Sequence, residues 1–308
     1  MTRHFIKFTD LTRAEILNVL EMSAALKAER HSGNYLHQHL GGRSVGMIFN
    51  KKSTRTRISF ESGITELGGH AIFMSEGQTQ FSRGELISHS ARVLSRYLAA
   101  VVIRTYYQSQ LEELAGYGSI PIINALTDEG HPCQILTDIF TALEKFPNEP
   151  VEKIKTAWIG DGNNMANSWI EAAGVLGFPL ALACPEGYDP DPAVLARAQA
   201  ANPKIKLCRD PKEAVKGAWT VNTDVWASMG QEEEQAVREK AFRDIYLVDS
   251  ALMALADPKA IFMHCLPAHP GEEVTDEVLE SPASVIFDEA ENRLHAQKGL
   301  MKFLIPAL

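Results

Sequence analysis

A group of hydroxyl and cationic residues directly follows an apolar run in the first quarter of the chain. The run Val45–Phe49 predicts a buried strand, and Ser53–Arg57 then fill the first turn of an amphipathic helix. Cations are unfavourable there because the helix dipole is already positive at that end. Unpaired main-chain N–H groups, hydroxyls and a guanidinium fork together suit a phosphate. The stretch therefore predicts a phosphate site, with Ser53 as an ordinary N-cap among solvated arginines as the alternative.

Five further polar features lie in the same topological place, at the end of a predicted strand. In open α/β sheets, ligands bind beyond the carboxyl ends of the parallel strands, so we expect these features to contribute to binding. Two of them have simpler explanations, an interdomain ion pair for Arg104 and a helix-capping histidine for His131. The five features are Arg104, His131–Gln134, Asn163–Asn164, Asp224–Gly230 and His264–Pro267.

Short apolar runs alternate with helical stretches over nearly the whole chain, which is typical of βαβ units with parallel sheets. The turn-rich segment 147–150 interrupts the alternation. We therefore predict an α/β protein of two domains, residues 1–146 and 151–290, each a parallel sheet flanked by helices, with the active site in the cleft between them. A C-terminal helix over 291–308 is expected to pack back onto the first domain. The predicted strands are Val45–Phe49, Ala71–Met74, Ala99–Ile103, Pro121–Asn124, Thr156–Ile159, Leu180–Ala183, Ile205–Cys208, Trp219–Val221 and Ala260–His264.

Composition narrows the class of protein. The 308 residues are 45% apolar and 22% charged with a net charge of −9, which fits a globular protein and disfavours a nucleic-acid binder. No apolar run approaches the ~20 residues of a membrane span, and the first residues do not resemble a signal peptide. The four cysteines have no CxxC spacing, so neither a disulfide framework nor a structural zinc site is expected. We predict a cytoplasmic protein.

The run Ser53-Thr54-Arg55-Thr56-Arg57 resembles the carbamoyl phosphate signature of the aspartate and ornithine carbamoyltransferases. Further motifs of this family follow in the family's order and extend the likeness over almost the whole chain. They are His131-Pro132-Cys133-Gln134, Asp224 with Ser228-Met229-Gly230, and His264-Cys265-Leu266-Pro267, of which the last two are typical of the ornithine branch.

The resemblance implies transfer of the carbamoyl group of carbamoyl phosphate to the δ-amino group of L-ornithine, giving citrulline and phosphate. It implies no metal and no organic cofactor, and a homotrimer. Citrulline breakdown stays open as the direction in the cell, and we favour a role in arginine biosynthesis. Residues 1–146 would bind carbamoyl phosphate and residues 151–290 would bind ornithine. Gln80 would reach the site of a neighbouring subunit, although without the resemblance its loop is an ordinary polar surface loop.

For carbamoyl phosphate, the resemblance places Arg104 and His131 at the carbonyl oxygen. The side chain of Gln134 and the main-chain carbonyl of Leu266 would accept hydrogen bonds from the carbamoyl NH2 group. Arg293 would be a further contact, and is otherwise a plain helix arginine. The implied carbamoyl phosphate contacts are Ser53, Thr54, Arg55, Thr56, Arg57, Gln80, Arg104, His131, Gln134, Cys265, Leu266 and Arg293.

For ornithine, the resemblance implies that Asn164 binds on the carboxylate side, that Asp224 pairs with the ammonium group, and that Ser228 and Met229 close over the ligand. Cys265 with Asp224 would orient the side chain and help the δ-amine lose its proton. That amine is otherwise protonated, with a pKa near the lysine value of about 10. The implied catalytic residues are Arg104, His131, Gln134, Asp224 and Cys265.

Several alternatives remain open at this stage. Gly160 and Gly162 have the spacing of a dinucleotide fingerprint, but Met165 stands in place of the third glycine. A cysteine nucleophile or a metal site could explain the pairing of Cys265 with its neighbouring histidine. A transferase for another amine, or a regulator that binds phosphate or an amino acid without catalysis, could use the same scaffold. Aspartate is disfavoured as the acceptor because Asp224 stands where cations would be required.

Overall fold

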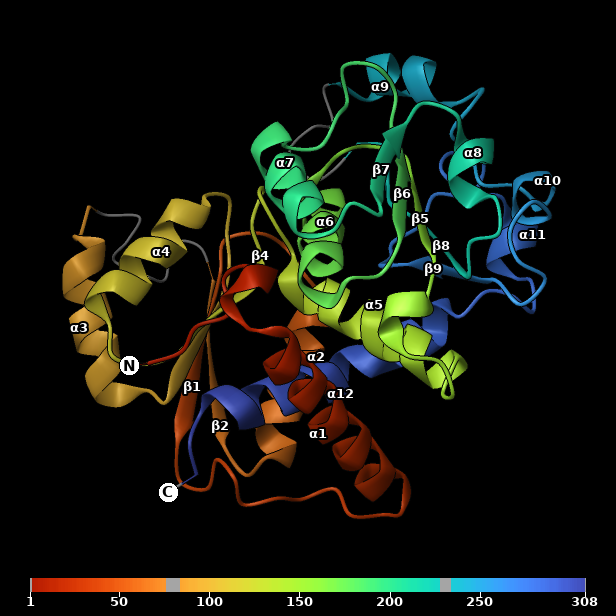
Figure 1. Cartoon of the computed structure of the whole chain (residues 1–308). Coiled ribbons are helices and arrows are strands. Elements are labelled where there is room, and N and C mark those ends of the chain that lie inside the picture. The colour runs from red at the N-terminus through yellow and green to blue at the C-terminus, as the bar shows by residue number, and fades with distance from the viewer. Residues whose placement is uncertain (1, 76–83, 228–233, 308) are drawn as a thin grey trace. The chain divides into compact units, whose positions relative to one another are not determined.

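The structure is a computed structural model that describes residues 2–75, 84–227 and 234–307 (Figure 1). Three of the predicted site residues, Gln80, Ser228 and Met229, lie outside these ranges. No helix of the described residues combines the length and the apolar character that a bilayer crossing requires. The chain divides into two compact units, which are described separately.

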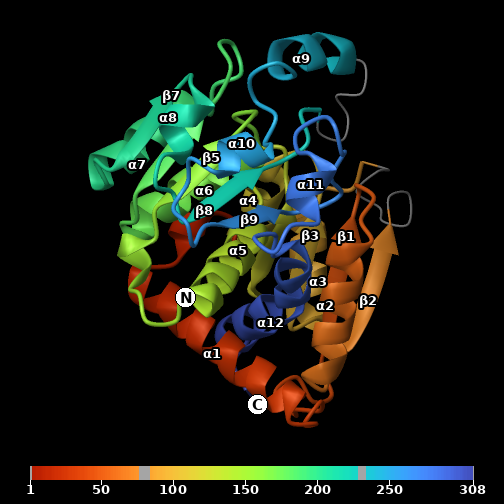
Figure 2. The ribbon, with the colours of Figure 1, turned by 90° about the vertical axis from the view of Figure 1, so that its right-hand side faces the viewer.

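The first unit comprises Met1–Thr137 and Glu291–Leu308 and contains a four-stranded parallel sheet in the order β2-β1-β3-β4. Helices α1, α2 and α12 cover one face of this sheet, and α3 and α4 cover the other (Figures 1 and 2). An apolar cluster packs α3 and α4 against the strands. The elements are a 3-10 helix at Phe8–Asp10, α1 Arg13–His31, β1 Ser44–Phe49, α2 Arg55–Glu66, β2 His70–Ser75, α3 Ile87–Tyr97, β3 Ala100–Arg104, α4 Gln108–Tyr117, β4 Ile122–Leu126, α5 Pro132–Lys145 and α12 Ile286–Leu304.

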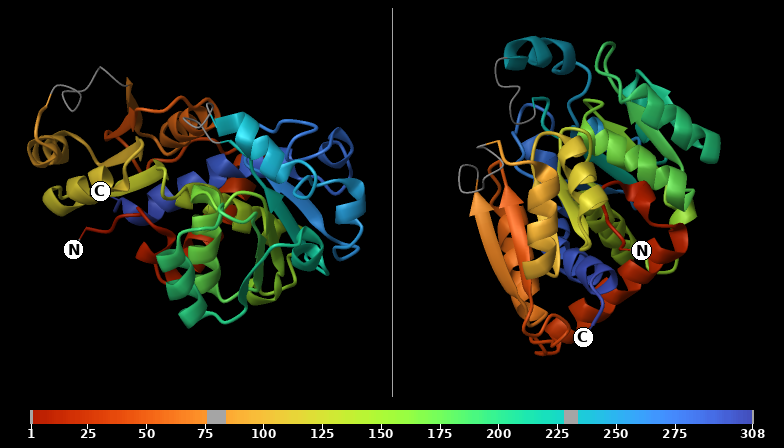
Figure 3. Two further views of the ribbon diagram at one scale, coloured as in Figure 1. Left: turned by 90° about the horizontal axis from the view of Figure 1, so that it is seen from above. Right: turned by 90° about the vertical axis from the view of Figure 1, so that its left-hand side faces the viewer.

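The second unit comprises Asp138–Ala290 and contains a five-stranded parallel sheet in the order β7-β6-β5-β8-β9. Helices α6 and α7 cover one face, and α8, α10 and α11 cover the other (Figures 1 and 3). The boundary between the units falls inside α5 and α12. The elements are a 3-10 helix at Val151–Lys153, β5 Thr156–Ile159, α6 Asn164–Leu176, β6 Leu180–Ala183, α7 Pro192–Ala201, β7 Ile205–Cys208, α8 Pro211–Val215, β8 Thr220–Thr223, α9 Gln235–Phe242, α10 Ser250–Met253, β9 Ile261–His264 and α11 Asp276–Leu279.

Each sheet has one point at which the strand order reverses. In the first unit the reversal lies between β1 and β3, where Phe49 pairs with Arg104. In the second unit it lies between β5 and β8, where Ile159 pairs with Thr223. Loops leave such a pair of strands in opposite directions and open a crevice at their carboxyl ends, which is the usual ligand site of an open α/β sheet. Each unit therefore has one topologically favoured binding position.

The predicted fold class is confirmed, with two parallel sheets flanked by helices. Strands β5, β6 and β7 have the predicted bounds, and the other six strands differ by one or two residues at one or both ends. Arg104 is the last residue of β3, and does not follow the strand, because a β-bulge between Ile103 and Arg104 extends the pairing to Leu126. Helix α12 begins at Ile286, before the predicted start at Glu291.

Gly162 is required by backbone packing. A Cβ at this position would lie 2.1 Å from the main-chain nitrogen of Pro190 and 2.3 Å from the carbonyl carbon of Asp189. The glycine of the "GDGNN" segment therefore lets two loops approach each other, which explains its presence without a nucleotide phosphate.

We expect Gly162→Ala to lower the free energy of unfolding by about 1–3 kcal/mol, because the two loop backbones must move apart. Urea unfolding measures this change. The control is Gly116→Ala in α4, where a Cβ has nothing within 4 Å and should be neutral or stabilising by up to about 1 kcal/mol. Equal stability of the Gly162→Ala variant and the parent would contradict the packing explanation.

Candidate active site

The start of α2 has main-chain donors without a capping side chain. Thr54 occupies the N-cap position and makes no side-chain hydrogen bond to the helix, and the first turn contains no acidic residue. The N-cap residue is therefore Thr54, and the alternative in which Ser53 is the N-cap is wrong. A helix start of this kind presents N–H groups and a positive dipole end to whatever lies beyond it, which favours an anion.

The two arginines of this turn differ in their surroundings. Arg57 is paired with Glu61 at 2.9 Å, and its guanidinium lies 3.7 Å from the centre of the Phe73 ring. Arg55 makes no hydrogen bond or ion pair with any residue that the structure describes. Arg55 is therefore the arginine of this turn whose charge is available to a ligand.

Five buried polar side chains of the first unit, each 5% exposed or less, gather beside this helix start. Arg293 of α12 donates one hydrogen bond to the side-chain oxygen of Gln134 and another to the hydroxyl of Thr56. The charges of Arg293 and Arg104 both act on His131. Residues from α2, β3, α5 and α12 therefore meet at the β1–β3 reversal point.

His131 is neutral at this site. Burial lowers the pKa of its imidazole well below the usual value, and the charges of Arg293 and Arg104 lower it further. A tight turn places the ring, because the main-chain N–H of Thr127 donates to the carbonyl of Gly130 at 2.8 Å, directly before α5. A neutral imidazole close to two guanidinium groups is suited to donate a hydrogen bond to an oxygen that gains negative charge.

In the second unit, Asp224 directly follows β8 and is 8% exposed. One carboxylate oxygen accepts from the main-chain N–H of Val225 at 2.9 Å and from the Cys265 thiol at 3.3 Å. The other accepts from the side-chain amide of Asn163 at 3.0 Å. Burial raises the pKa of Asp224, while the charge of His264 and these hydrogen bonds oppose that shift.

Cys265 is a thiol at neutral pH. Burial raises its pKa well above the usual value, and the negative charges of Asp224 and Glu289 raise it further. Burial also raises the pKa of Cys133, to about 12. The nucleophile in cysteine catalysis is the thiolate, so neither residue has the environment of an activated nucleophile. Cys265 acts instead as a hydrogen-bond donor to Asp224.

The ligand atoms of Asp224, His264 and Cys265 lie within 4.8 Å of one another, a spacing that a metal ion could use. The His264 ring, however, already faces protein partners on both sides. Its Nδ1 accepts from the main-chain N–H of Leu266 at 2.9 Å, and its Nε2 lies 3.3 Å from a carboxylate oxygen of the fully buried Glu273. His264 therefore serves to hold the backbone at Leu266.

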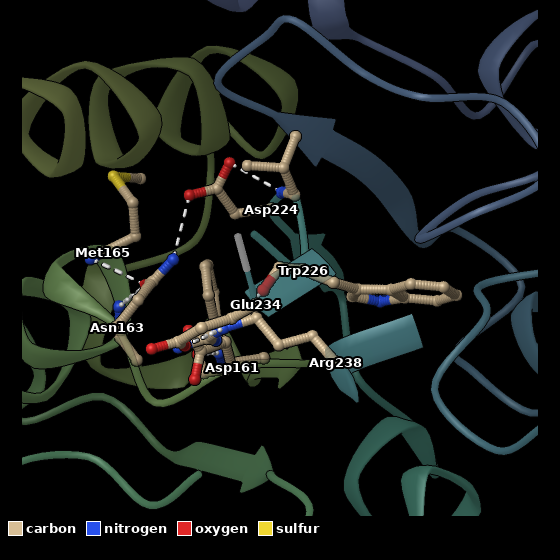
Figure 4. Close-up of polar contacts among 10 residues, drawn as sticks. Asp161, Asn163, Met165, Asp224, Trp226, Glu234 and Arg238 are labelled. Atoms are coloured by element: carbon tan, nitrogen blue, oxygen red, sulfur yellow. Dashed lines mark hydrogen bonds and ion pairs between the residues drawn. The ribbon is translucent and has the colours of Figure 1, made fainter. Parts of the chain in front are cut away.

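The asparagine that reaches Asp224 is Asn163. Its side-chain oxygen caps α6 by accepting from Met165 and Ala166, and its amide nitrogen is thereby directed at Asp224 (Figure 4). Asn164, which the resemblance assigns to the carboxylate side of ornithine, is the first residue of α6. The N-cap thus fixes the orientation of the carboxylate at the β5–β8 reversal point.

A second polar network flanks the segment 228–233. Arg238 of α9 donates to the carbonyl of Trp226 at 3.0 Å and to the carboxylate of Glu234, also at 3.0 Å, so it contacts described residues on either side of that segment. It also donates to Asp161 at 2.7 Å, as Figure 4 shows. Burial raises the pKa of Asp161 to about 6, against the opposing charge of Arg238 and with a further upward contribution from Asp224.

The sequence missed the supporting residues of the second unit. Asp161 stands inside a glycine pattern, Glu273 is one of two adjacent glutamates, and Arg238 lies in a helix rich in charged residues. None of these contexts distinguishes a buried partner from a surface charge. A signal was available only for Asn163, because asparagine before an apolar helix is a common N-cap.

Comparison with known families accounts for both units. Residues 3–144 match the model of the aspartate/ornithine carbamoyltransferase carbamoyl-P binding domain. Residues 152–304 match the Asp/Orn binding domain of the same family. Together the two matches span nearly the whole chain.

Full-length relatives support the same family assignment. The chain is 54% identical over 305 residues to the ornithine carbamoyltransferase of Oleidesulfovibrio alaskensis, with 99% of each chain covered. Among solved structures, the ornithine carbamoyltransferase from Pyrococcus furiosus superposes with a TM-score of 0.93 at 44% identity, covering 99% of this chain and 97% of that one. The anabolic ornithine carbamoyltransferase from Campylobacter jejuni gives 0.91 at 40% identity, covering 98% of each chain.

The fold and these matches show that the protein is an α/β carbamoyltransferase enzyme. The chain belongs to the aspartate/ornithine carbamoyltransferase family.

Proposed function

We propose that the chain transfers the carbamoyl group of carbamoyl phosphate to the δ-amino group of L-ornithine, giving L-citrulline and phosphate. The observation that supports this most is the chemical contrast between the two reversal points. One gathers guanidinium groups at an uncapped helix start, and the other gathers a carboxylate with its amide and thiol donors. The first suits a dianion and the second suits a cationic amine. Relatives of about half identity bear the name of this activity.

The phosphate would lie at the start of α2, held by the N–H groups and hydroxyls of residues 53–56 and by the Arg55 guanidinium. The carbonyl oxygen would accept hydrogen bonds from Arg104 and from neutral His131. Charge grows on that oxygen when the amine adds, and loss of one such donor typically costs about 10²–10³ in rate. Gln134, fixed by Arg293, would accept from the carbamoyl NH2 group together with the Leu266 carbonyl.

Ornithine would bind at Asp224 with its carboxylate towards Asn164. Its δ-amine attacks the carbonyl carbon only after it has lost a proton, since the amine is otherwise protonated at neutral pH. The new C–N bond forms, the C–O bond to phosphate breaks, and phosphate leaves with the electron pair of that bond and a proton from the amine. Asp224, with the Cys265 thiol as its donor, orients the amine. Holding the amine and the carbonyl carbon close together in the orientation for attack supplies the remaining rate enhancement.

A panel of amines tests the acceptor. We expect citrulline with carbamoyl phosphate and L-ornithine, and little product with N-acetylornithine, putrescine, L-lysine or L-aspartate, measured by colorimetry and by phosphate release. A faster reaction with another amine would reassign the substrate. Binding of carbamoyl phosphate and ornithine without any product would favour the alternative of a regulator that binds its ligands without catalysis.

We infer a cytoplasmic role in arginine biosynthesis, supported by the likeness to a structure titled anabolic. Expression of the chain in an arginine auxotroph that lacks this activity should restore growth without arginine. Growth only when citrulline is supplied would contradict a biosynthetic role.

We also propose that the chain acts as a homotrimer in which Gln80 of each subunit contacts carbamoyl phosphate bound to its neighbour. Gln80→Ala and Arg55→Ala subunits should each be nearly inactive alone. Mixed after dissociation and reassembly, they should recover activity, because some sites then combine two native halves. Light scattering reports the assembly. Absence of recovery in mixed trimers would contradict a shared site.

Arg238 should influence ornithine use, because the resemblance assigns Ser228 and Met229 to the ornithine site and Arg238 contacts residues on either side of them. We expect Arg238→Gln to raise the KM for ornithine about tenfold or more, with a smaller effect on the KM for carbamoyl phosphate, because one residue contacts both Trp226 and Glu234. The exposed Arg243→Gln, which breaks only a surface pair with Glu239, is the matched control and should change neither constant appreciably.

The ion pair between Arg238 and Asp161 predicts a pH dependence. Because the pKa of Asp161 is raised to about 6, its carboxylate is charged above that pH and becomes protonated below it, where the hold on Arg238 weakens. The KM for ornithine should therefore rise, beyond what the amine's own titration causes, as pH falls through about 6. Asp161→Asn, which resembles the protonated form, should remove this extra rise. An unchanged profile in Asp161→Asn would refute the link.

A further inference from the structure

Outside the active site, three potential metal ligands meet where α1 and α12 pack together. His31 is the last residue of α1, and Glu291 and His295 lie one turn apart on α12. One ligand atom from each of the three lies within 4.8 Å of the other two. The helices approach closely, since a Cβ on Gly299 would lie 2.1 Å from the Ser23 hydroxyl, and Figure 2 shows the two helices side by side.

The spacing fits a zinc-type ion. Metal–ligand bonds of about 2.0–2.1 Å in a tetrahedral site place neighbouring ligand atoms about 3.4 Å apart. Here a carboxylate oxygen of Glu291 lies 3.0 Å from His31 Nε2 and 3.5 Å from His295 Nε2. A hydrogen bond explains the first separation equally well. The second separation is at the upper limit of a hydrogen bond, and His295 Nε2 does not have good hydrogen-bond geometry towards Glu291.

His295 provides an independent indication. Its side chain is fully buried, yet neither ring nitrogen makes a hydrogen bond with any residue in the described part of the chain. Buried polar atoms in folded proteins nearly always have partners, and leaving them without one is unfavourable. A metal ion at Nε2 would remove that penalty for the nitrogen that faces Glu291.

The protonation states also suit a cation. Burial lowers the pKa of His295 to about 4, and the charge of Lys27 contributes, so the ring is neutral at pH 7. Burial alone would raise the pKa of Glu291, but its hydrogen bond with His31 and the charge of Lys27 lower it, so the carboxylate is ionised. Metal ligands must be deprotonated in this way. Lys27 itself opposes a second cation and should limit the affinity.

We propose that His31, Glu291 and His295 form a binding site for a divalent transition-metal ion of the zinc type, which links the C-terminal end of α1 to α12. Two imidazoles and one carboxylate are a ligand set that zinc uses, with a water in the fourth position. Arg293 lies two residues from both Glu291 and His295, about 200° around the helix, so the ion would lie on the face of α12 away from the active site. The site is independent of the transferase reaction.

Zinc titration of the full-length Cys265→Ser protein, which lacks the active-site thiol, tests the proposal by calorimetry and thermal unfolding. We expect one Zn²⁺ per chain and a raised Tm that a chelator reverses. His31→Gln and His295→Gln should each weaken binding about tenfold or more. Lys27→Gln should strengthen it several-fold, because the opposing charge is removed. The exposed His89→Gln is the control and should bind as the parent does.

His31→Gln is the decisive variant, because His31 is more than half exposed and its loss should not impair folding. If the parent binds no Zn²⁺, or if His31→Gln binds it as tightly as the parent, the proposal is wrong. Co²⁺ gives a second readout. Its visible spectrum should report nitrogen and oxygen ligands in the parent, and that spectrum should be lost in His31→Gln.

Discussion

Arg55→Ala should lower kcat/KM for carbamoyl phosphate about 100-fold while the protein stays folded. Arg55 is the first residue of α2 and makes no ion pair with the described residues, so its replacement leaves no partner uncompensated. A charge-assisted hydrogen bond is worth about 1.5–3 kcal/mol, or roughly 10–100-fold, and the helix start amplifies its effect on a dianion. Steady-state kinetics with saturating ornithine measure the change.

The matched control is Arg57→Ala, two residues further along the same turn. Arg57 already has Glu61 and the Phe73 ring as partners, so its loss should cost activity less than about fivefold. If the two variants behave alike, the surroundings of the two arginines do not decide which one binds phosphate. A near-normal kcat/KM for carbamoyl phosphate in Arg55→Ala would exclude the phosphate role itself.

Cys265→Ala should lower kcat/KM for ornithine about 10–100-fold and change the affinity for carbamoyl phosphate much less. The thiol donates to the carboxylate of Asp224, which is 8% exposed, and loss of a donor to a buried charge costs about 1.5–3 kcal/mol. Because the pKa of the thiol is raised, its removal should not abolish any titration near neutral pH. Kinetics with each substrate varied in turn, from pH 6 to 9, measure both effects.

Cys208→Ala is the control for Cys265. This half-buried thiol on β7 donates to the carbonyl of Leu182, far along the sheet from the β5–β8 reversal point. Its loss should leave both kinetic constants unchanged. Equal losses for the two substrates in Cys265→Ala would refute the assignment of Cys265 to the ornithine side.

The strands could be predicted from sequence because most are short apolar runs, and several, such as β3 and β5, are buried on both faces. The strand order could not, because it depends on pairings such as Phe49 with Arg104 across more than fifty residues. Strand order matters for function, since it places Arg104 beside Phe49, at the end of the strand that leads to α2.

The predicted site residues share a visible feature, which is an unusual side chain directly after an apolar strand. The residues that support them have no such feature. Glu273 lies in a loop after β9, and only the fold shows that it is fully buried against His264. His295 reads as an ordinary helix histidine, although the structure buries it completely. Long-range burial of a polar residue leaves no local pattern in the sequence.

Isothermal titration of carbamoyl phosphate into the folded protein, without ornithine, tests the central claim most directly. The account predicts heat corresponding to one molecule per chain, retained in Cys265→Ala and lost in Arg55→Ala. Absence of heat in the parent, or undiminished binding in Arg55→Ala, would contradict it.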